Sequence, residues 1–390
     1  MITERPKILS YEQDANALTI GTGGEIPIFI SPTLNETPLA GIGQYSKYSE
    51  ANKLVSEGGI GTATSNFLLP VLKDFFEESL KQQADDIGVP HIYVKDLGTS
   101  VPATAAPWVT AISDAKIKND VRVEAYVFQK PADADASAIT TLTNNIISIM
   151  ESVASSLKTE AEKGRPRIAY FTVLGFNETQ LREFTKLSNT NKILNSRIYL
   201  VEPNDFGKTI ARICTTPVPD EPGYYRYRSV NPGHFAERSD ADIDNKDTTG
   251  NVPLGLQHCG IVVNCDEKTT SEVYPRINLC VATSYALGDD ERPTDSLLHA
   301  RRNVDQLQRE AVDVVFQQLK RRETDGYLSD TQAELDLLVY NKVEAGFMKS
   351  DTSITVVESD DVNAPEELEI ITEAYPVNIT GKITMTTYIH

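Results

Sequence analysis

The sequence has few of the residues that usually carry metal or redox chemistry. Its 390 residues include 4 cysteines, 5 histidines and 1 tryptophan. The cysteines are too few and too irregularly spaced for a disulfide framework, and free cysteines are usually buried as small apolar side chains. We therefore expect Cys214, Cys259, Cys265 and Cys280 to be reduced core residues, and we expect no cofactor.

Long apolar runs and excess positive charge are also missing. Residues 1–10 lack the apolar centre of a secretory signal, and no later stretch reaches the roughly 18 apolar residues of a membrane span. Lysine and arginine number 37 against 56 aspartates and glutamates, a net charge of -19. Such a chain repels nucleic acid and anionic membranes. We expect cytoplasmic synthesis, with neither nucleic acid nor membrane insertion.

Enzyme signatures are largely absent. The sequence contains no P-loop, nucleophile elbow, zinc-protease helix motif or CxxC pair. His258, Cys259 and Cys265 match no standard zinc spacing. The acidic segment 240–247 begins like a calcium loop, but asparagines stand where the turn glycine and the bidentate glutamate belong. We expect a solvated loop there and no metal site.

Strand and helix patterns alternate through the first half of the chain. Apolar runs indicate strands at 26–30, 91–97, 121–129, 167–174 and 197–201, and helical spacing is present at 65–80, 137–162, 177–187 and 205–214. Such alternation favours right-handed crossovers and a largely parallel sheet. We predict an α/β fold (α+β overall), with a central α/β sandwich-type domain built on a mixed, largely parallel sheet.

The alternation stops near 217–253, where proline, glycine, aspartate and clustered tyrosines indicate a loop and a domain seam. Beyond it we predict strands at 260–264 and 277–283, a helix along 304–319, and a helix from a capping box at 329–332 to Gly346. The predicted domains are an N-terminal arm at 1–20, an α/β domain at 21–255, a C-terminal α+β domain at 256–375 and a C-terminal arm at 376–390.

Residues 377–390 alternate between an apolar and a polar face, which is typical of a strand. Two interpretations are open: an edge strand of the chain's own sheet, or a strand donated to the sheet of another subunit. Burying the apolar side chains contributes about 8–15 kcal/mol, while ordering costs about 1–2 kcal/mol per residue. The strand therefore needs hydrogen bonds from a preformed sheet. Its apolar residues are Val377, Ile379, Ile383, Met385 and Ile389.

The last third of the chain resembles the domain shared by sheath proteins of contractile phage tails and related contractile injection systems. The resemblance lies in 275–279 running into 282–284, in Arg292-Pro293, in the helix at 301–305, and in 374–378 before a last strand. Upstream, 38–56, the helix at 65–80, the strand at 92–94 and the segment 168–172 are similar to the family's opening. The pattern rests on the order of elements and includes no catalytic signature.

This resemblance implies a structural subunit and not an enzyme. Sheath subunits polymerise as rings or helical strands around an inner tail tube, and they contract to drive the tube through a target envelope. The family joins its subunits through N- and C-terminal arms that complete a neighbour's sheet, while the domains move as rigid bodies. The implied partners are further copies of the chain, the inner tube protein, and baseplate and tail terminator proteins. The implied location is a virion tail assembled in the host cytoplasm, or a cytoplasmic injection particle.

Basic residues flank the helix that begins near residue 301: Arg301, Arg302, Lys320, Arg321 and Arg322. They could form a face complementary to the tube, or they could be ordinary charges near helix ends. Trp108 and the tyrosines Tyr224, Tyr225 and Tyr227 are equally compatible with a contact surface and with a core.

Two other functions are compatible with the sequence. An α/β enzyme, either a hydrolase or a nucleotide-dependent transferase, would have its site at the strand ends of the central domain. A tube or baseplate protein is the second, although a tube protein would be smaller and mostly β.

Overall fold

The computed structural model describes residues 24–32, 41–51, 67–82, 89–98, 104–190, 196–218, 222, 248–249, 252–253, 260–268, 273–277, 297–318, 326–358 and 368–377. Several predictions fall outside these residues. They concern the N-terminal arm, the terminal strand after Val377, the tyrosine cluster, the acidic segment 240–247, and Lys320, Arg321 and Arg322.

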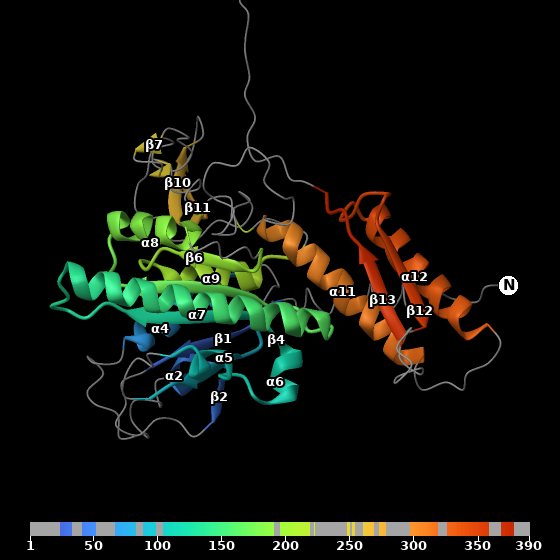
Figure 1. Cartoon of the computed structure of the whole chain (residues 1–390), viewed down its shortest axis with the longest axis horizontal. Helices are drawn as coiled ribbons and strands as arrows, with labels where there is room; N and C mark the ends of the chain where they lie inside the picture. Colours follow the sequence, from blue (N-terminus) through green and yellow to red (C-terminus); the bar gives the residue numbers. More distant parts are fainter. Residues whose placement is uncertain are drawn as a thin grey trace, which may run out of the picture.

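A seven-stranded sheet forms the centre of the molecule (Figure 1), in the order β2-β3-β1-β4-β5-β6-β9. Neighbouring strands pair in parallel, except that β2 runs antiparallel to β3. The predicted α/β class with a mixed, largely parallel sheet is confirmed. The strand bounds are β1 Ile26–Ser31, β2 Ile42–Tyr45, β3 Ile92–Asp96, β4 Val121–Gln129, β5 Ile168–Leu174, β6 Ile198–Val201 and β9 Ile261–Val262.

Helices cover both faces of this sheet. On one face lie α5 (Ala106–Val109), α7 (Ala136–Glu162) and α8 (Glu178–Thr190), and on the other lie α4 (Leu68–Gln82) and α9 (Phe206–Thr215). Two shorter helices are α2 (Tyr48–Ala51) and α6 (Ala115–Asp120). Each helix packs on the strand side chains that point to its side of the sheet, because successive residues of a strand point to opposite faces.

Local signals in the sequence fix the helix ends. The Asp135 carboxylate accepts a bond from the Ala138 amide at 2.8 Å and begins α7. The Asn177 side chain accepts from the Gln180 amide at 2.9 Å, while the Gln180 side chain accepts from the Asn177 amide at 3.0 Å. This reciprocal cap confirms the helix start predicted at residue 177.

Trp108, whose position the sequence left undecided, and Cys214 lie in the core. Trp108 is fully buried and stacks on Phe128, with ring centroids 4.3 Å apart. Of its two interpretations, the core position is therefore correct. Cys214 is a buried free thiol, as predicted, and burial raises the pKa of that thiol well above its usual value.

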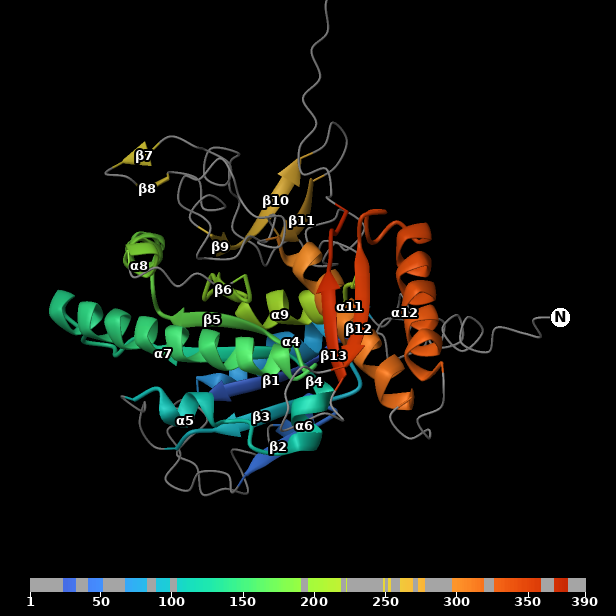
Figure 2. The ribbon, with the colours of Figure 1, turned by 45° about the vertical axis from the view of Figure 1, so that its right-hand side comes forward.

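The C-terminal part has its own hydrophobic core. Helices α11 (Leu298–Gln318) and α12 (Tyr327–Glu344) pack with the antiparallel hairpin of β12 (Ser353–Glu358) and β13 (Leu368–Glu373). Figure 2 shows the hairpin upright beside α12. We call these four elements the C-terminal unit. Two further antiparallel pairs are β7 (Thr248–Thr249) with β8 (Val252–Pro253) and β10 (Asn264–Lys268) with β11 (Val273–Ile277).

Two predicted boundaries differ from the structure. The sheet continues past residue 255, because β9 is its last strand. The strand predicted at 277–283 lies outside the described residues except for Ile277, the last residue of β11. The capping box at 329–332 does not begin α12. That helix begins at Tyr327 after Gly326, whose φ of 101° is favourable only for glycine, and Ser329 donates to the Gly326 carbonyl instead.

Candidate assembly interface

Helix α11 belongs to both cores and connects them (Figure 1). Leu298, at its first turn, packs with the α/β sandwich, whereas Val304, Leu307 and Ala311 pack in the C-terminal unit. The placement of the C-terminal unit on the sandwich therefore depends on how this one helix is held.

Buried ion pairs hold α11 on the sandwich. Asp305 pairs with Arg197, which precedes β6, and with Arg301 at 2.7 Å. Arg302 pairs with Glu25 at 3.1 Å and donates to the Thr216 carbonyl at 2.7 Å. Burial acts to raise the pKa of Asp305, but the two guanidinium groups outweigh it and hold that pKa below its usual value. Asp305 is therefore ionised at neutral pH and fixes α11 to the sheet.

These ion pairs bear on the predicted basic, tube-facing surface, because two of its residues, Arg301 and Arg302, take part in them. Arg301 is 8% exposed and Arg302 is 1% exposed, and both are paired within the chain. In this structure they do not form an exposed basic face, which speaks against the predicted tube-facing role of these two residues. Lys320, Arg321 and Arg322 lie outside the described residues.

The β12–β13 hairpin has two edges that differ in their contacts. On β12, the Gln332 side chain of α12 donates to the Ile354 carbonyl at 2.8 Å and accepts from the Val356 amide at 3.1 Å. The backbone groups of Ile354 and Val356 therefore point away from β13, and a side chain already covers that edge.

The outer edge of β13 has no equivalent cover among the described residues. Ile354 pairs with Thr372 and Val356 with Ile370. Because directly opposite residues of an antiparallel pair point their backbone groups the same way, inward or outward, Ile370 and Thr372 also point outward. Within the described chain, no hydrogen bond from outside the hairpin reaches these two residues. An unpaired edge of this kind is a template for another strand.

The chain leaves the C-terminal unit beside this hairpin. After β13, the Lys349 amide donates to the Tyr375 carbonyl at 2.8 Å and the Val377 amide donates to the Phe347 carbonyl at 3.1 Å. Pro376 is buried and bridges to Met348. Pro376 and Val377 are thus attached to their own chain, and a donated segment would begin at residue 378 and not at 376. Ile379, Ile383, Met385 and Ile389 lie outside the described residues.

Exposed apolar side chains gather on the C-terminal unit. Among the described residues, large hydrophobic side chains with high exposure are Phe316 (56%), Tyr340 (56%), Tyr375 (47%), Ile371 (46%) and Val377 (37%). Each belongs to α11, α12, β13 or the segment that follows β13. Exposed apolar groups concentrated on one part of a molecule mark an interaction surface.

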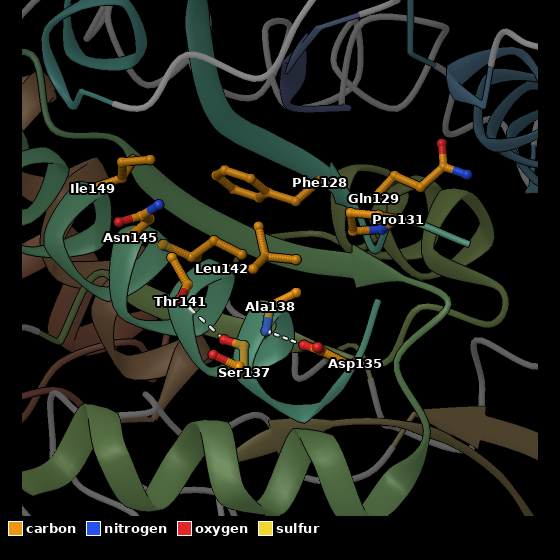
Figure 3. Close-up of a pocket in the computed structure, with 11 residues that line it drawn as sticks. Phe128, Gln129, Pro131, Asp135, Ser137, Ala138, Thr141, Leu142, Asn145 and Ile149 are labelled. Atoms are coloured by element: carbon orange, nitrogen blue, oxygen red, sulfur yellow. Dashed lines mark hydrogen bonds between the residues drawn. The ribbon is translucent and has the colours of Figure 1, made fainter. Parts of the chain in front are cut away.

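The strand ends of the sandwich are where the alternative enzyme would have its site. A hollow of about 510 Å³ lies at the end of β4, beside the first turns of α7. Figure 3 shows Phe128 and Leu142 in its wall, while Asp135 bonds the Ala138 amide and Thr141 donates to the Ser137 carbonyl. The acidic group therefore caps a helix, and the lining includes no histidine, lysine or cysteine to act as a base or nucleophile.

The described residues contain neither a metal-binding cluster nor a membrane-spanning helix. Within the described ranges, no group of three or more histidine, cysteine, aspartate or glutamate residues is placed to hold a metal ion. No helix in the described part of the chain is long and apolar enough to cross a membrane.

The contacts that join α11 to the α/β sandwich could not be predicted from the sequence. Arg302 and Glu25 are 277 positions apart, and Arg197 and Asp305 are 108 apart. No local spacing links such pairs. Gln332 was placed only as part of a capping box, whereas its function is to bond β12.

Comparison with known proteins shows the fold. No family model and no curated protein matches the sequence. A chain of the anti-feeding prophage baseplate is similar, with 13% identity, a TM-score of 0.56, and coverage of 94% of this chain and 93% of that chain. A sheath tail protein from Listeria innocua is similar with 7% identity, a TM-score of 0.53, and coverage of 95% and 96%. The chain therefore has the fold of a sheath tail protein over nearly its whole length.

Proposed function

We propose that this chain is the structural subunit of a contractile tail sheath. It polymerises around an inner tail tube and shortens to drive the tube through a target envelope, either on a phage or in a related injection particle. The observation that carries the proposal is the shared fold along 95% of the chain with a sheath tail protein. Its partners would be further copies of itself, the tube protein, and baseplate and terminator proteins, in a tail assembled in the cytoplasm.

Strand exchange is the linkage that the C-terminal unit supports. The alternating segment 378–390 begins where Val377 is anchored, next to a hairpin whose β13 edge has no partner among the described residues. A two-stranded hairpin gains stability from additional strands, and a segment that cannot be ordered by its own contacts gains ladder hydrogen bonds from a preformed edge. Each subunit would thus donate residues 378–390 to β13 of a neighbour, with its outward-pointing groups at Ile370 and Thr372 as acceptors.

A structural function also fits the internal bonding better than the enzyme alternative. The ion pairs at Asp305 and Arg302 tie the C-terminal unit to the sandwich, so a pull on the exchanged strand would move the two parts together. This is the behaviour required of a subunit that moves as a rigid body. The strand-end hollow, in contrast, supplies no pairing of nucleophile and base.

Deleting residues 378–390 tests the proposal. We expect a soluble, folded monomer that forms no tubes in negative-stain micrographs, because the deletion leaves every described bond of Pro376 and Val377 in place. Two matched full-length variants test the apolar face and the polar face of the segment separately. Replacing Ile379, Ile383 and Met385 with asparagine should abolish assembly, whereas replacing Thr380, Thr384 and Thr386 with serine should preserve it. Tubes formed by the truncated chain would refute the donated strand.

A further inference from the structure

Two arginines from distant parts of the chain have their guanidinium groups close together, where α11 meets the start of β4. Arg122 lies at the start of β4, and Arg309 lies in α11 and reaches the Asn119 carbonyl near the end of α6. Both guanidinium groups donate to the backbone carbonyls of Asn119 and Val121, and Arg309 also donates to the Pro166 carbonyl. Because they share the same acceptors, the two cationic groups lie side by side.

Neither arginine has a carboxylate partner among the residues that the structure describes. Within the described residues, no aspartate or glutamate oxygen lies within ion-pair distance, 4.0 Å, of Arg122 or Arg309. Arg309 Nε is buried without a hydrogen-bond partner in the described structure. Two neighbouring cations that lack an anion are costly to hold together, since like charges at short range repel each other.

The acidic groups around the pair are engaged elsewhere. Glu25 pairs with Arg302, and Asp305 is bridged by two other arginines. The Asp120 carboxylate accepts a bond from the Tyr93 hydroxyl at 3.2 Å. Asp313 is exposed on α11 and influences Arg122 only through its charge. These carboxylates offset part of the positive charge of the pair from a distance. Within the described residues, none of them forms an ion pair with either guanidinium group.

The electrostatic consequence agrees with this geometry. Burial, followed by the positive charge of Arg122, lowers the pKa of Arg309 to about 9. Burial also lowers the pKa of Arg122. An anion placed against both groups would remove this repulsion and raise both pKa values. Arg122 and Arg309 are each partly exposed as residues.

We propose that Arg122 and Arg309 form an oxyanion-binding site, which takes a carboxylate or a phosphate through hydrogen bonds from both guanidinium groups. Paired arginines are suited to this ligand class, because a planar guanidinium matches two oxygens of a carboxylate or phosphate at once. The oxyanion has two possible sources: an acidic side chain of a second copy of this acidic chain, or free phosphate. Only the first source depends on the proposed sheath function.

Inorganic phosphate serves as the probe. Calorimetric titration of the full-length protein, at constant ionic strength with chloride as the balancing anion, should show one phosphate bound per chain. Arg309→Gln and Arg122→Gln should each weaken binding about tenfold or more, as expected for the loss of hydrogen bonds between charged groups. The control is Lys158→Gln, which removes one positive charge from the exposed face of α7 and should bind phosphate like the wild type.

The outcomes decide whether the oxyanion site exists and where its natural oxyanion comes from. Absence of phosphate binding to the wild type overturns the proposal, as does unchanged binding by folded Arg122→Gln protein. If phosphate binds and also delays tube formation, and if the glutamine variants assemble poorly, the natural oxyanion is a neighbour's carboxylate. If phosphate binds while assembly is unaffected, it is a free oxyanion. Arg122→Gln carries the test alone if Arg309→Gln does not fold, since Arg122 bonds only carbonyls of its own segment.

Discussion

Replacing Asp305 with asparagine removes the charge that fastens α11 to the α/β sandwich. The Asp305 side chain is bonded to Arg197 and Arg301, and the residue is 7% exposed. Asparagine has nearly the same volume, so no cavity forms. Two buried guanidinium groups would instead lose the negative charge of Asp305. Removing one member of a buried ion pair costs about 3–5 kcal/mol, and we expect the free energy of unfolding to fall by that amount.

Urea denaturation measures this change through two signals. Far-UV circular dichroism reports the whole chain, and fluorescence of Trp108, the only tryptophan, reports the sandwich core. Asp313→Asn is the matched control, because Asp313 lies in the same helix, is exposed and is in no ion pair of the described structure. That control should change the stability by less than about 0.5 kcal/mol. An Asp305→Asn protein as stable as the control would refute the fastening role.

Three further predictions follow from particular contacts. The stability difference between wild type and Asp305→Asn should be constant from about pH 8 to pH 5 and shrink below about pH 4. The reason is that the pKa of Asp305 is lower in the folded state than in the unfolded state. Urea denaturation at several pH values measures this difference. Gly207→Ala should lower the thermal midpoint, at a cost of about 1–3 kcal/mol, because its Cβ would lie 2.0 Å from the Val71 carbonyl oxygen. Thr372→Pro removes an outward amide of β13 and should block tube formation while leaving circular dichroism unchanged; normal tubes would exclude β13 as the acceptor edge.

Most helices and strands could be predicted because their signals are local. The strand at 121–129 matches β4 residue for residue, and the helix at 137–162 differs from α7 by one residue at its start. Apolar periodicity and capping side chains act over a few residues, so they can be recognised in sequence. The start of α12 was wrong because Gly326 in a left-handed conformation competes with the capping box that follows it.

By itself, the sequence determined the α/β class, the acidic character, and the alternating final segment, since each depends on composition or short-range periodicity. Only the tertiary structure decided that Arg301 and Arg302 form buried ion pairs and that Arg122 lies beside Arg309. It also decided that Gln332 covers the β12 edge of the hairpin, while the β13 edge has no such cover among the described residues. These contacts join residues from distant parts of the chain, and their geometry exists only once the sheet and α11 have packed together.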